Sequence, residues 1–249
     1  MERDILGYRA RFGVLGPSTN TIVEPEFSEM RPAGVTNHYS RIVIKNASAI
    51  SNETFMQGTL EIDRKTYEAV EGVLTMGPDY LVMGMSAVTF YGGAEGAQKW
   101  KDNIQSKSGL KISLGSEAVA AALKAHGNIK KIAFLSPYYP VANAEVANYL
   151  SDHGYETVRD KPLQCPSWHD IARVTPSTVR ETVNALNGDD VDAIVQVGTN
   201  LCMARQAERL EMELNKPVIA INTATYWHAL RANGIEDKIS GFGRLLSEF

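Results

Sequence analysis

The sequence predicts an α/β protein built from two similar lobes. Strand-like apolar runs alternate with amphipathic helical runs along the whole chain, which is typical of mostly parallel sheets flanked by helices. The second half of the chain also repeats the order of the first half. We therefore expect two pseudo-symmetric three-layer α/β/α lobes, each with a mostly parallel sheet, and a candidate active-site cleft between the lobes.

The first half supplies four expected strands and three expected helices. Helices are predicted from apolar residues at helical spacing, and one of them has Ser116 as candidate N-cap and Gly127 as C-cap. The expected strands are residues 10–17, 40–46, 79–86 and 110–115, and the expected helices are residues 59–76, 93–106 and 116–127.

The second half follows the same rhythm. One of its helices is opened by Thr175, with Pro176 at the first helical position. The expected strands are residues 130–137, 155–160, 191–198 and 216–222, and the expected helices are residues 141–154 and 175–187, one from about Met203, and 223–234.

Three pairs of segments match between the halves. "FGVLGPS" (12–18) matches "AFLSPY" (133–138), "LVMGMS" (81–86) matches "VQVGTN" (195–200), and "LGSEAVAAALKAHG" (114–127) matches "INTATYWHALRANG" (221–234). We assign residues 1–115 and 224–249 to the first lobe and 116–223 to the second. Alternatively, two unrelated lobes share the same strand–turn–helix order. Either way, ligands of open α/β sheets bind at the carboxyl ends of the strands, which face the cleft here.

Composition excludes several classes of function. The 249-residue chain has a net charge of −4 and no basic cluster, so we expect no nucleic-acid partner. Its apolar runs are too short to span a membrane, and its N-terminus lacks the apolar core of a signal peptide, so we expect a cytoplasmic protein without membrane contact. The histidines are scattered, and no metal-binding or phosphate-binding motif occurs. No metal or other cofactor is expected.

Four turns follow the strands that should face the cleft, at residues 16–20, 84–93, 136–140 and 198–200. None contains Lys or Arg, and their donors are hydroxyls, amides and glycine backbone: Ser18, Thr19, Asn20, Ser86, Thr89, Ser136, Tyr138, Tyr139, Thr199 and Asn200. Neutral donors at helix N-termini suit a small carboxylate and an enolate-type oxyanion. The alternative for each Ser or Thr is helix capping.

Two thiols and one histidine are separate candidates. Cys202 should lie near the first turn of its helix, where the helix dipole lowers a thiol pKa; alternatively it is a small residue packing the helix onto the sheet. Cys165 lies in a loop that could face the cleft. His169 adjoins this loop, either as a general acid or base or as an exposed loop residue. In a reducing compartment both thiols should be free.

Three motifs resemble known enzymes. "RFGVLGPSTNTIVEPEF" resembles the start of maleate cis–trans isomerases, "LVMGMSAVTFYGGA" resembles a strand and turn of arylmalonate decarboxylase, and "KPVIAINTATYWHALRANG…GFGRLL" is similar to that enzyme's C-terminal region. Both enzymes belong to the aspartate/glutamate racemase superfamily, which has two pseudo-symmetric α/β lobes around one cleft. The resemblance covers residues 11 to about 246 and implies a homodimer or homotetramer.

The resemblance also implies which catalytic groups this chain lacks. The superfamily commonly uses one cysteine from each lobe, and the decarboxylase keeps only the second-lobe cysteine. Gly84 matches the first of these positions and Gly198 the second. Both usual catalytic cysteines are therefore absent.

The family's carboxylate-binding residues do carry over by resemblance. The first-turn asparagine corresponds to Asn20, beside Pro17 and Ser18, and the oxyanion donors correspond to Ser86, the Met85 backbone, Tyr138 and Thr199. A carboxylate-binding asparagine of the maleate isomerases falls on Trp168, which replaces a polar donor with a flat aromatic group.

The resulting hypothesis is an enzyme of the maleate isomerase/arylmalonate decarboxylase type. It would act on a small mono- or dicarboxylate through an enolate-like intermediate, by decarboxylation or isomerisation. Ser86, Tyr138 and Thr199 would stabilise the negative charge, with Asn200 as a further donor, and the non-standard proton donor would be Cys202, Tyr138, His169 or Cys165. The alternative is a catalytically silent carboxylate-binding protein that acts as a sensor or accessory subunit.

Overall fold

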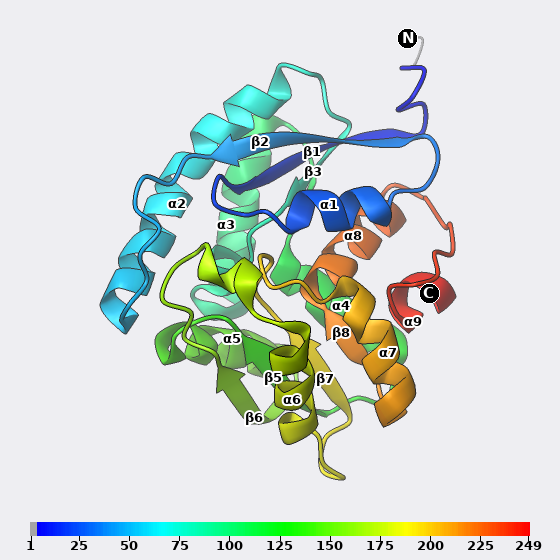
Figure 1. Cartoon of the computed structure of the whole chain (residues 1–249). Coiled ribbons are helices and arrows are strands. Elements are labelled where there is room, and N and C mark those ends of the chain that lie inside the picture. The colour runs from blue at the N-terminus through cyan, green and yellow to red at the C-terminus, as the bar shows by residue number, and fades with distance from the viewer. Residues whose placement is uncertain (1–3) are drawn as a thin grey trace.

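A computed structural model describes residues 4–249 and contains two parallel four-stranded sheets (Figure 1). The first has the order β2-β1-β3-β4 and the second β6-β5-β7-β8. The strands are β1 Ala10–Pro17, β2 Val35–Ile42, β3 Tyr80–Met83, β4 Ile112–Ser113, β5 Lys131–Ser136, β6 Glu156–Pro162, β7 Ala193–Gln196 and β8 Val218–Ala220. The predicted α/β class with parallel sheets is confirmed.

Helices connect the successive parallel strands of each sheet. Two short 3₁₀ helices, η1 and η2, follow β3 and precede α6. The elements are α1 Val23–Glu29, α2 Asn52–Leu74, η1 Ala87–Phe90, α3 Gly93–Ser108, α4 Gly115–His126, α5 Pro140–Asp152, η2 Asp170–Arg173, α6 Pro176–Leu186, α7 Ala204–Leu214, α8 Ile221–Ala232 and α9 Arg244–Glu248. Within residues 4–249, no helix is long and apolar enough to cross a membrane.

The two sheets have the same topology. In each, the first strand in the chain pairs with the second and third, and the third pairs with the fourth. The matched sequence segments occupy equivalent places, since 12–18 and 133–138 begin on β1 and β5, 81–86 and 195–200 begin on β3 and β7, and all four run into the turns that follow. The predicted lobe boundaries at 115/116 and 223/224 stay a prediction, and residues 1–3 of the first lobe lie outside the described residues.

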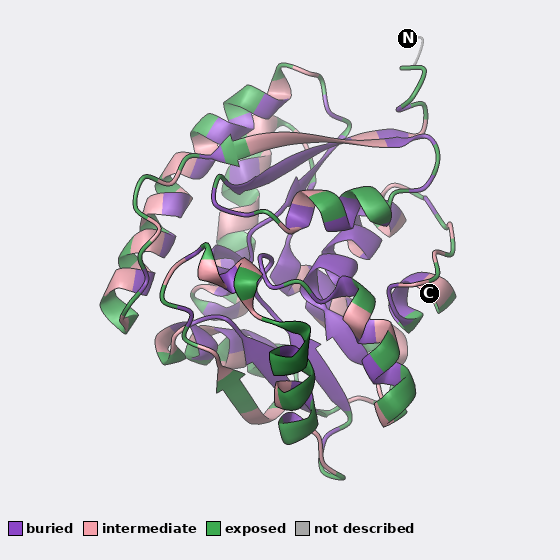
Figure 2. Cartoon of the chain, in the orientation of Figure 1, coloured by how far each residue is buried: buried purple, intermediate pink, exposed green. Residues whose placement is uncertain are grey.

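The core runs through both sheets and the layer between them. The inner strands and nearly all of α8 are buried, while the outer helices expose one face (Figure 2). Helix α8 packs on α4, so the matched segments 114–127 and 221–234 meet each other at the centre of the molecule. This contact joins the lobes close to the strand ends that the two sheets turn toward each other.

Several predicted boundaries are wrong. The second strand was expected at 40–46, but β2 ends at Ile42 because its partner β1 ends at Pro17 and leaves no strand to pair with later residues. Helix α2 begins seven residues before the expected position, since Ser51 and Thr54 form a capping box.

Two further corrections concern the matched helices α4 and α8. Ser116 is not an N-cap; it lies inside the first turn of α4, and its N–H donates to Thr89 Oγ1. Helix α8 begins at Ile221, two residues early, where Gln196 Oε1 accepts the Ile221 N–H. The predicted N-cap at Thr175 and the C-cap at Gly127 are confirmed.

Candidate active site

The strand ends of both lobes surround one narrow cavity. Its open space is about 30 Å³, enough for about two water-sized groups, so a larger ligand requires its walls to move apart. The cavity is lined by Pro17, Thr19, Asn20, Ile62, Met85, Ser86, Ala87, Tyr138, Trp168, Ile171, Gly198, Thr199 and Asn200. Each of the four turns expected to converge contributes at least one of these residues.

Ser18 is an expected binding residue that the structure places elsewhere. It is exposed, and its hydroxyl accepts the Ile44 N–H at 3.0 Å. Strand β1 ends at Pro17, and the turn that follows places Thr19 and Asn20 at the cavity, whereas the Ser18 side chain is directed to Ile44. Ser18 therefore shapes the turn that follows β1.

Hydroxyl groups from opposite lobes meet at the centre of the cavity. Ser86 Oγ lies 2.6 Å from the Tyr138 hydroxyl and accepts the Gly198 N–H at 3.2 Å. Burial raises the pKa of Tyr138 well above its usual value, so the phenol keeps its proton at neutral pH. Tyr138 thus presents a protonated hydroxyl group at the cavity.

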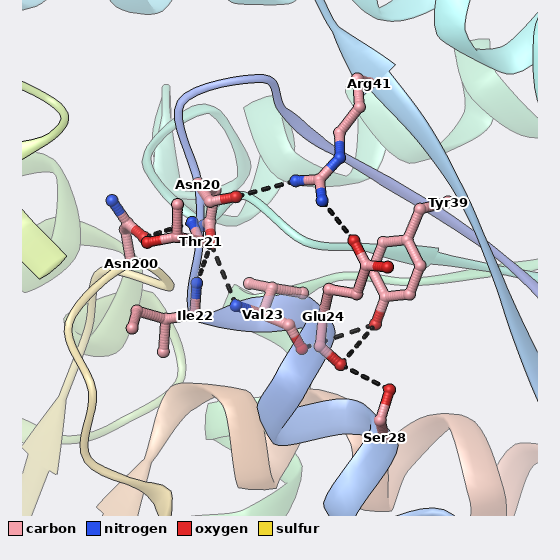
Figure 3. Close-up of polar contacts among 9 residues, drawn as sticks. All are labelled: Asn20, Thr21, Ile22, Val23, Glu24, Ser28, Tyr39, Arg41 and Asn200. Carbon is pink, nitrogen blue, oxygen red and sulfur yellow. Dashed lines mark hydrogen bonds and ion pairs between the residues drawn. The ribbon is translucent and has the colours of Figure 1, made fainter.

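Asn20 holds the first turn against the second lobe. Its Oδ1 accepts the Ile22 and Val23 N–H groups, each at 3.0 Å, as Figure 3 shows. Its Nδ2 donates to Thr199 Oγ1 at 3.1 Å, and Thr199 Oγ1 donates to the Gly84 carbonyl at 2.9 Å. An amide nitrogen has two protons, so one remains for a ligand.

Asn200 also bridges the lobes. Its Oδ1 accepts the Thr21 N–H at 2.9 Å (Figure 3), and its Nδ2 donates to the Trp168 carbonyl at 2.8 Å. Its oxygen is therefore occupied by the protein, but its Nδ2 keeps one proton, so Asn200 can donate to a ligand through this proton or through its backbone N–H.

The turns after β3 and β7 offer equivalent backbone donors. Among residues 4–249, no acceptor contacts the N–H groups of Met85 and Ser86 in the first lobe or of Thr199 and Asn200 in the second. All four residues line the cavity. Two such N–H pairs, one on each side, can bind carboxylate oxygens or a developing oxyanion.

One side of the cavity is apolar. Trp168 is buried, packs against Phe55 with the ring centroids 4.8 Å apart and the rings tilted, and lines the cavity together with Ile62 and Ile171. The indole edge also lies against Gly58 of α2, where an added Cβ would come within 2.9 Å of Trp168 Cζ2. The large side chain fits because position 58 has no side chain.

The loop that carries Trp168 is tied to the first lobe. The Trp168 N–H donates to the Ala47 carbonyl at 2.8 Å, and the Ala49 N–H donates to the Pro166 carbonyl at 3.0 Å. Between these bonds Ser48 and Ser167 form an isolated antiparallel bridge. These bonds hold the lobes closed beside the cavity.

The thiols and His169 do not line this cavity. The expected lowering of the Cys202 pKa is wrong, because partial burial of the thiol and the charge of the adjacent Glu26 raise it to about 11. The alternative, a small residue packed between helix and sheet, is also wrong, because the residue as a whole is exposed. Burial raises the pKa of Cys165 to about 11. His169 is exposed, as its alternative interpretation predicts. Of the four proposed proton donors, the cavity contains Tyr138.

The two glycines at the expected thiol positions differ. Gly198 has φ of +98°, and an added Cβ would lie 2.3 Å from Pro137 Cδ. An added Cβ on Gly84 would meet the Leu15 carbonyl and Val23 Cγ1 at 3.0 Å. Gly198 does not accept any side chain in this backbone, whereas Gly84 does so only if its neighbours shift.

Sequence reasoning missed Glu26 and Asn222, which lie behind the second-lobe turn. Asn222 Nδ2 donates to the Thr199 carbonyl at 2.8 Å and to Glu26 Oε2 at 2.6 Å. Asn222 falls within a matched segment, opposite Gly115, so the repeat could have identified it as a point of difference. Glu26 carries no sequence signal, because acidic residues in a first helical turn are common on exposed faces.

Comparisons with known proteins agree with this architecture. The maleate isomerases of Pseudomonas putida and Alcaligenes faecalis are 26% and 25% identical to this chain, covering 95% of it and 97% and 96% of those proteins. A mutant maleate cis-trans isomerase of Nocardia farcinica with a covalently bound succinylcysteine intermediate superposes with a TM-score of 0.86, at 20% identity, over 96% of this chain and 99% of that one.

A second solved structure has the same fold. Unliganded arylmalonate decarboxylase superposes with a TM-score of 0.78 at 19% identity, over 96% of this chain and all of that chain (100%). The family model described as arylmalonate decarboxylase matches residues 14–246. That match includes all four turns around the cavity, and the chain belongs to the arylmalonate decarboxylase family.

Proposed function

We propose that this protein is a decarboxylase of small malonate-type acids that works through an enediolate intermediate, with Tyr138 as the proton donor. One observation carries the proposal: Tyr138 is the one titratable side chain among the described residues that line the cavity. The other polar lining groups are neutral amides, hydroxyls and backbone N–H groups.

The neutral donors suit the retained carboxylate. The N–H pairs of Met85–Ser86 and Thr199–Asn200 have no protein acceptor and can bind oxygens on which negative charge grows as the enediolate forms. Their orientation is set by the turns, so they need little reorganisation during the reaction. Ser86 Oγ, which accepts from Gly198, orients the Tyr138 hydroxyl toward the same space.

The apolar side suits the departing group. Trp168, Ile62 and Ile171 give a carboxylate placed there no charged partner, so loss of carbon dioxide is favoured. The carbon–carbon bond breaks, its electron pair stays on the substrate as the enediolate, and the Tyr138 proton goes to the carbon. Water then reprotonates the phenolate.

Cysteine-dependent isomerisation is less well supported. The Nocardia farcinica relative forms a succinylcysteine intermediate. In the described part of this chain, neither Cys165 nor Cys202 lines the cavity, and Gly198 excludes a side chain. Decarboxylation needs no nucleophile, only a proton donor and an oxyanion site.

The test is turnover of phenylmalonate, malonate and maleate in deuterated water, followed by NMR. We expect carbon dioxide release from a malonate and one deuterium at the α-carbon of the product. Tyr138→Phe should lower kcat by about 100-fold or more, the usual contribution of a general acid, and leave binding nearly unchanged.

Tyr139→Phe is the matched control. Tyr139 is the half-buried neighbour of Tyr138 and does not line the cavity, so its variant should keep wild-type kcat. Conversion of maleate to fumarate would contradict the proposal in favour of an isomerase. A malonate that raises the melting temperature of the wild-type protein without being consumed would contradict it in favour of a binding protein.

A further inference from the structure

Glu26 is a buried acidic residue on α1 of the first lobe, and its side chain accepts hydrogen bonds from the start of α7 in the second lobe and from α8. The residue is 6% exposed. Its Oε1 accepts the N–H groups of Met203 at 3.1 Å and Ala204 at 3.0 Å, at the start of α7. Its Oε2 accepts Asn222 Nδ2 at 2.6 Å. Burial raises the pKa of Glu26, while the hydrogen bonds that it accepts and the dipole of α7 favour the ionised carboxylate.

Asn222 carries this contact to the turn that lines the cavity. The same Nδ2 that donates to Glu26 also donates to the Thr199 carbonyl at 2.8 Å. No peptide bond in residues 4–249 is cis, and in a planar trans peptide the C=O and the following N–H point in opposite directions. Holding the Thr199 carbonyl toward Asn222 therefore points the Asn200 N–H away from Asn222, and Asn200 lines the cavity.

We propose that Glu26 is a positioning residue of the active site, which acts through Asn222 to orient the Thr199–Asn200 peptide as an oxyanion donor. The inference rests on the proposed function for its catalytic consequence. Glu26 does not line the cavity, so it acts only through the residues that it holds.

The chemistry of the contact requires a carboxylate. Both oxygens of Glu26 face N–H donors, and a carboxylate has acceptors on both sides. A glutamine here would turn its own NH₂ group toward either α7 or Asn222, so one donor would lose its partner. The Asn222 amide could then rotate, since its Oδ1 has no hydrogen-bond partner among the described residues that would hold it in place.

A second contact between the same two helices provides the matched control. Glu29 of α1 accepts from Arg205 Nε of α7 at 2.6 Å, on the surface, and touches no residue of the turn. Glu29→Gln removes a carboxylate from the same helix pair without changing the contacts of Asn222 or Thr199. Any loss of activity that Glu26→Gln and Glu29→Gln share therefore results from weaker association of the two lobes.

The experiment is a double-mutant cycle on the full chain with Glu26→Gln, Asn222→Ala and the double variant, beside Glu29→Gln. The first readout is the backbone amide resonance of Asn200 in a deuterated, ¹⁵N-labelled protein. The second is kcat and KM for phenylmalonate. If Glu26 acts through Asn222, both single variants shift the Asn200 resonance and lower kcat by about 10-fold with KM within about twofold, since one oxyanion donor is misaligned.

The double variant then decides the mechanism. Because two residues in one chain of contacts are not additive, the double variant should be no worse than the worse single variant. Additive losses, or an unchanged Asn200 resonance in Glu26→Gln, would overturn the proposal, as would an equal kcat loss in Glu29→Gln. The Asn200 resonance can be measured without turnover. It therefore tests whether Glu26 positions the Asn200 N–H even if the wild-type protein consumes no phenylmalonate and the proposed function fails.

Discussion

Each lobe uses carboxylates on the helix after its first strand to cap a helix of the other lobe, but the two contacts differ in burial. In one, Glu26 of α1 accepts the N–H groups of Met203 and Ala204 at the start of α7. In the equivalent contact, Asp152 and Glu145 of α5 accept the N–H groups of Ala94 and Gly92 at the start of α3, on the surface. Topology thus provides the same contact twice.

The difference shows how a repeated contact can acquire one specialised copy. At the exposed copy, water can replace either carboxylate, and the helix that it caps begins beyond η1, away from the turn at Ser86. At the buried copy, Glu26 and its partners are shielded from solvent, and Asn222 extends the contact to the turn at Thr199. Burial therefore raises the free energy lost when the Glu26 contact is removed, and it fixes the orientation of the groups that Glu26 holds.

The largest expected effect comes from removing the two carboxylates. Glu26→Ala leaves three buried donors without an acceptor and should lower the free energy of unfolding by ~3 kcal/mol. Asp152→Ala should lower it by ~0.5 kcal/mol, as at other exposed positions. Urea denaturation measures both. Equal losses would mean that burial does not distinguish the two contacts.

A smaller effect separates the equivalent glycines Gly84 and Gly198. Gly198→Ala should destabilise the protein by ~2 kcal/mol, because φ is +98° and the new Cβ overlaps the Pro137 ring. Gly84→Ala should cost ~1 kcal/mol, since its contacts are at 3.0 Å and its φ is not positive. Thermal unfolding of the two variants would contradict this order if Gly84→Ala were the less stable.

The smallest effect reports the charge of Glu26 itself. A thiol pKa raised from 9.0 to about 11 makes Cys202 ~100-fold less ionised at pH 8.5. A thiolate of higher pKa is intrinsically more nucleophilic, which recovers part of the lost reactivity. Iodoacetamide should therefore react with Cys202 ~10-fold more slowly than with an unperturbed thiol.

Glu26→Gln should accelerate the alkylation of Cys202, because removing the negative charge lowers the thiol pKa. Mass spectrometry of the Cys202 peptide measures the rate, with buried Cys165 as an internal comparison. An alkylation rate in Glu26→Gln equal to that in the wild-type protein would show that a charge on Glu26 does not raise the pKa of Cys202.

The convergence of the four turns could be read from the chain because parallel strands present their carboxyl ends at one edge of a sheet. Thr199, Ser86 and Tyr138 were found in this way, since each follows a buried strand within three residues. Ser18 was misplaced because it lies in the turn after β1, where the geometry of the turn directs its hydroxyl to the Ile44 N–H instead of the cavity. The pKa of Cys202 was misjudged because partial burial of the thiol and the charge of Glu26, which lies on a helix distant in sequence, both raise it.

Local pattern by itself determined the class of fold, the order of elements, the repeat and the turns that line the cavity, because apolar periodicity and capping residues act within a few positions. The tertiary structure alone decided which turn residues face the cavity, that Gly198 excludes a side chain, and that Glu26 and Asn222 hold the turn. Glu26 lies 177 residues from Met203 and 196 from Asn222. Partners so distant are set by the packing of one lobe on the other, which no local pattern encodes.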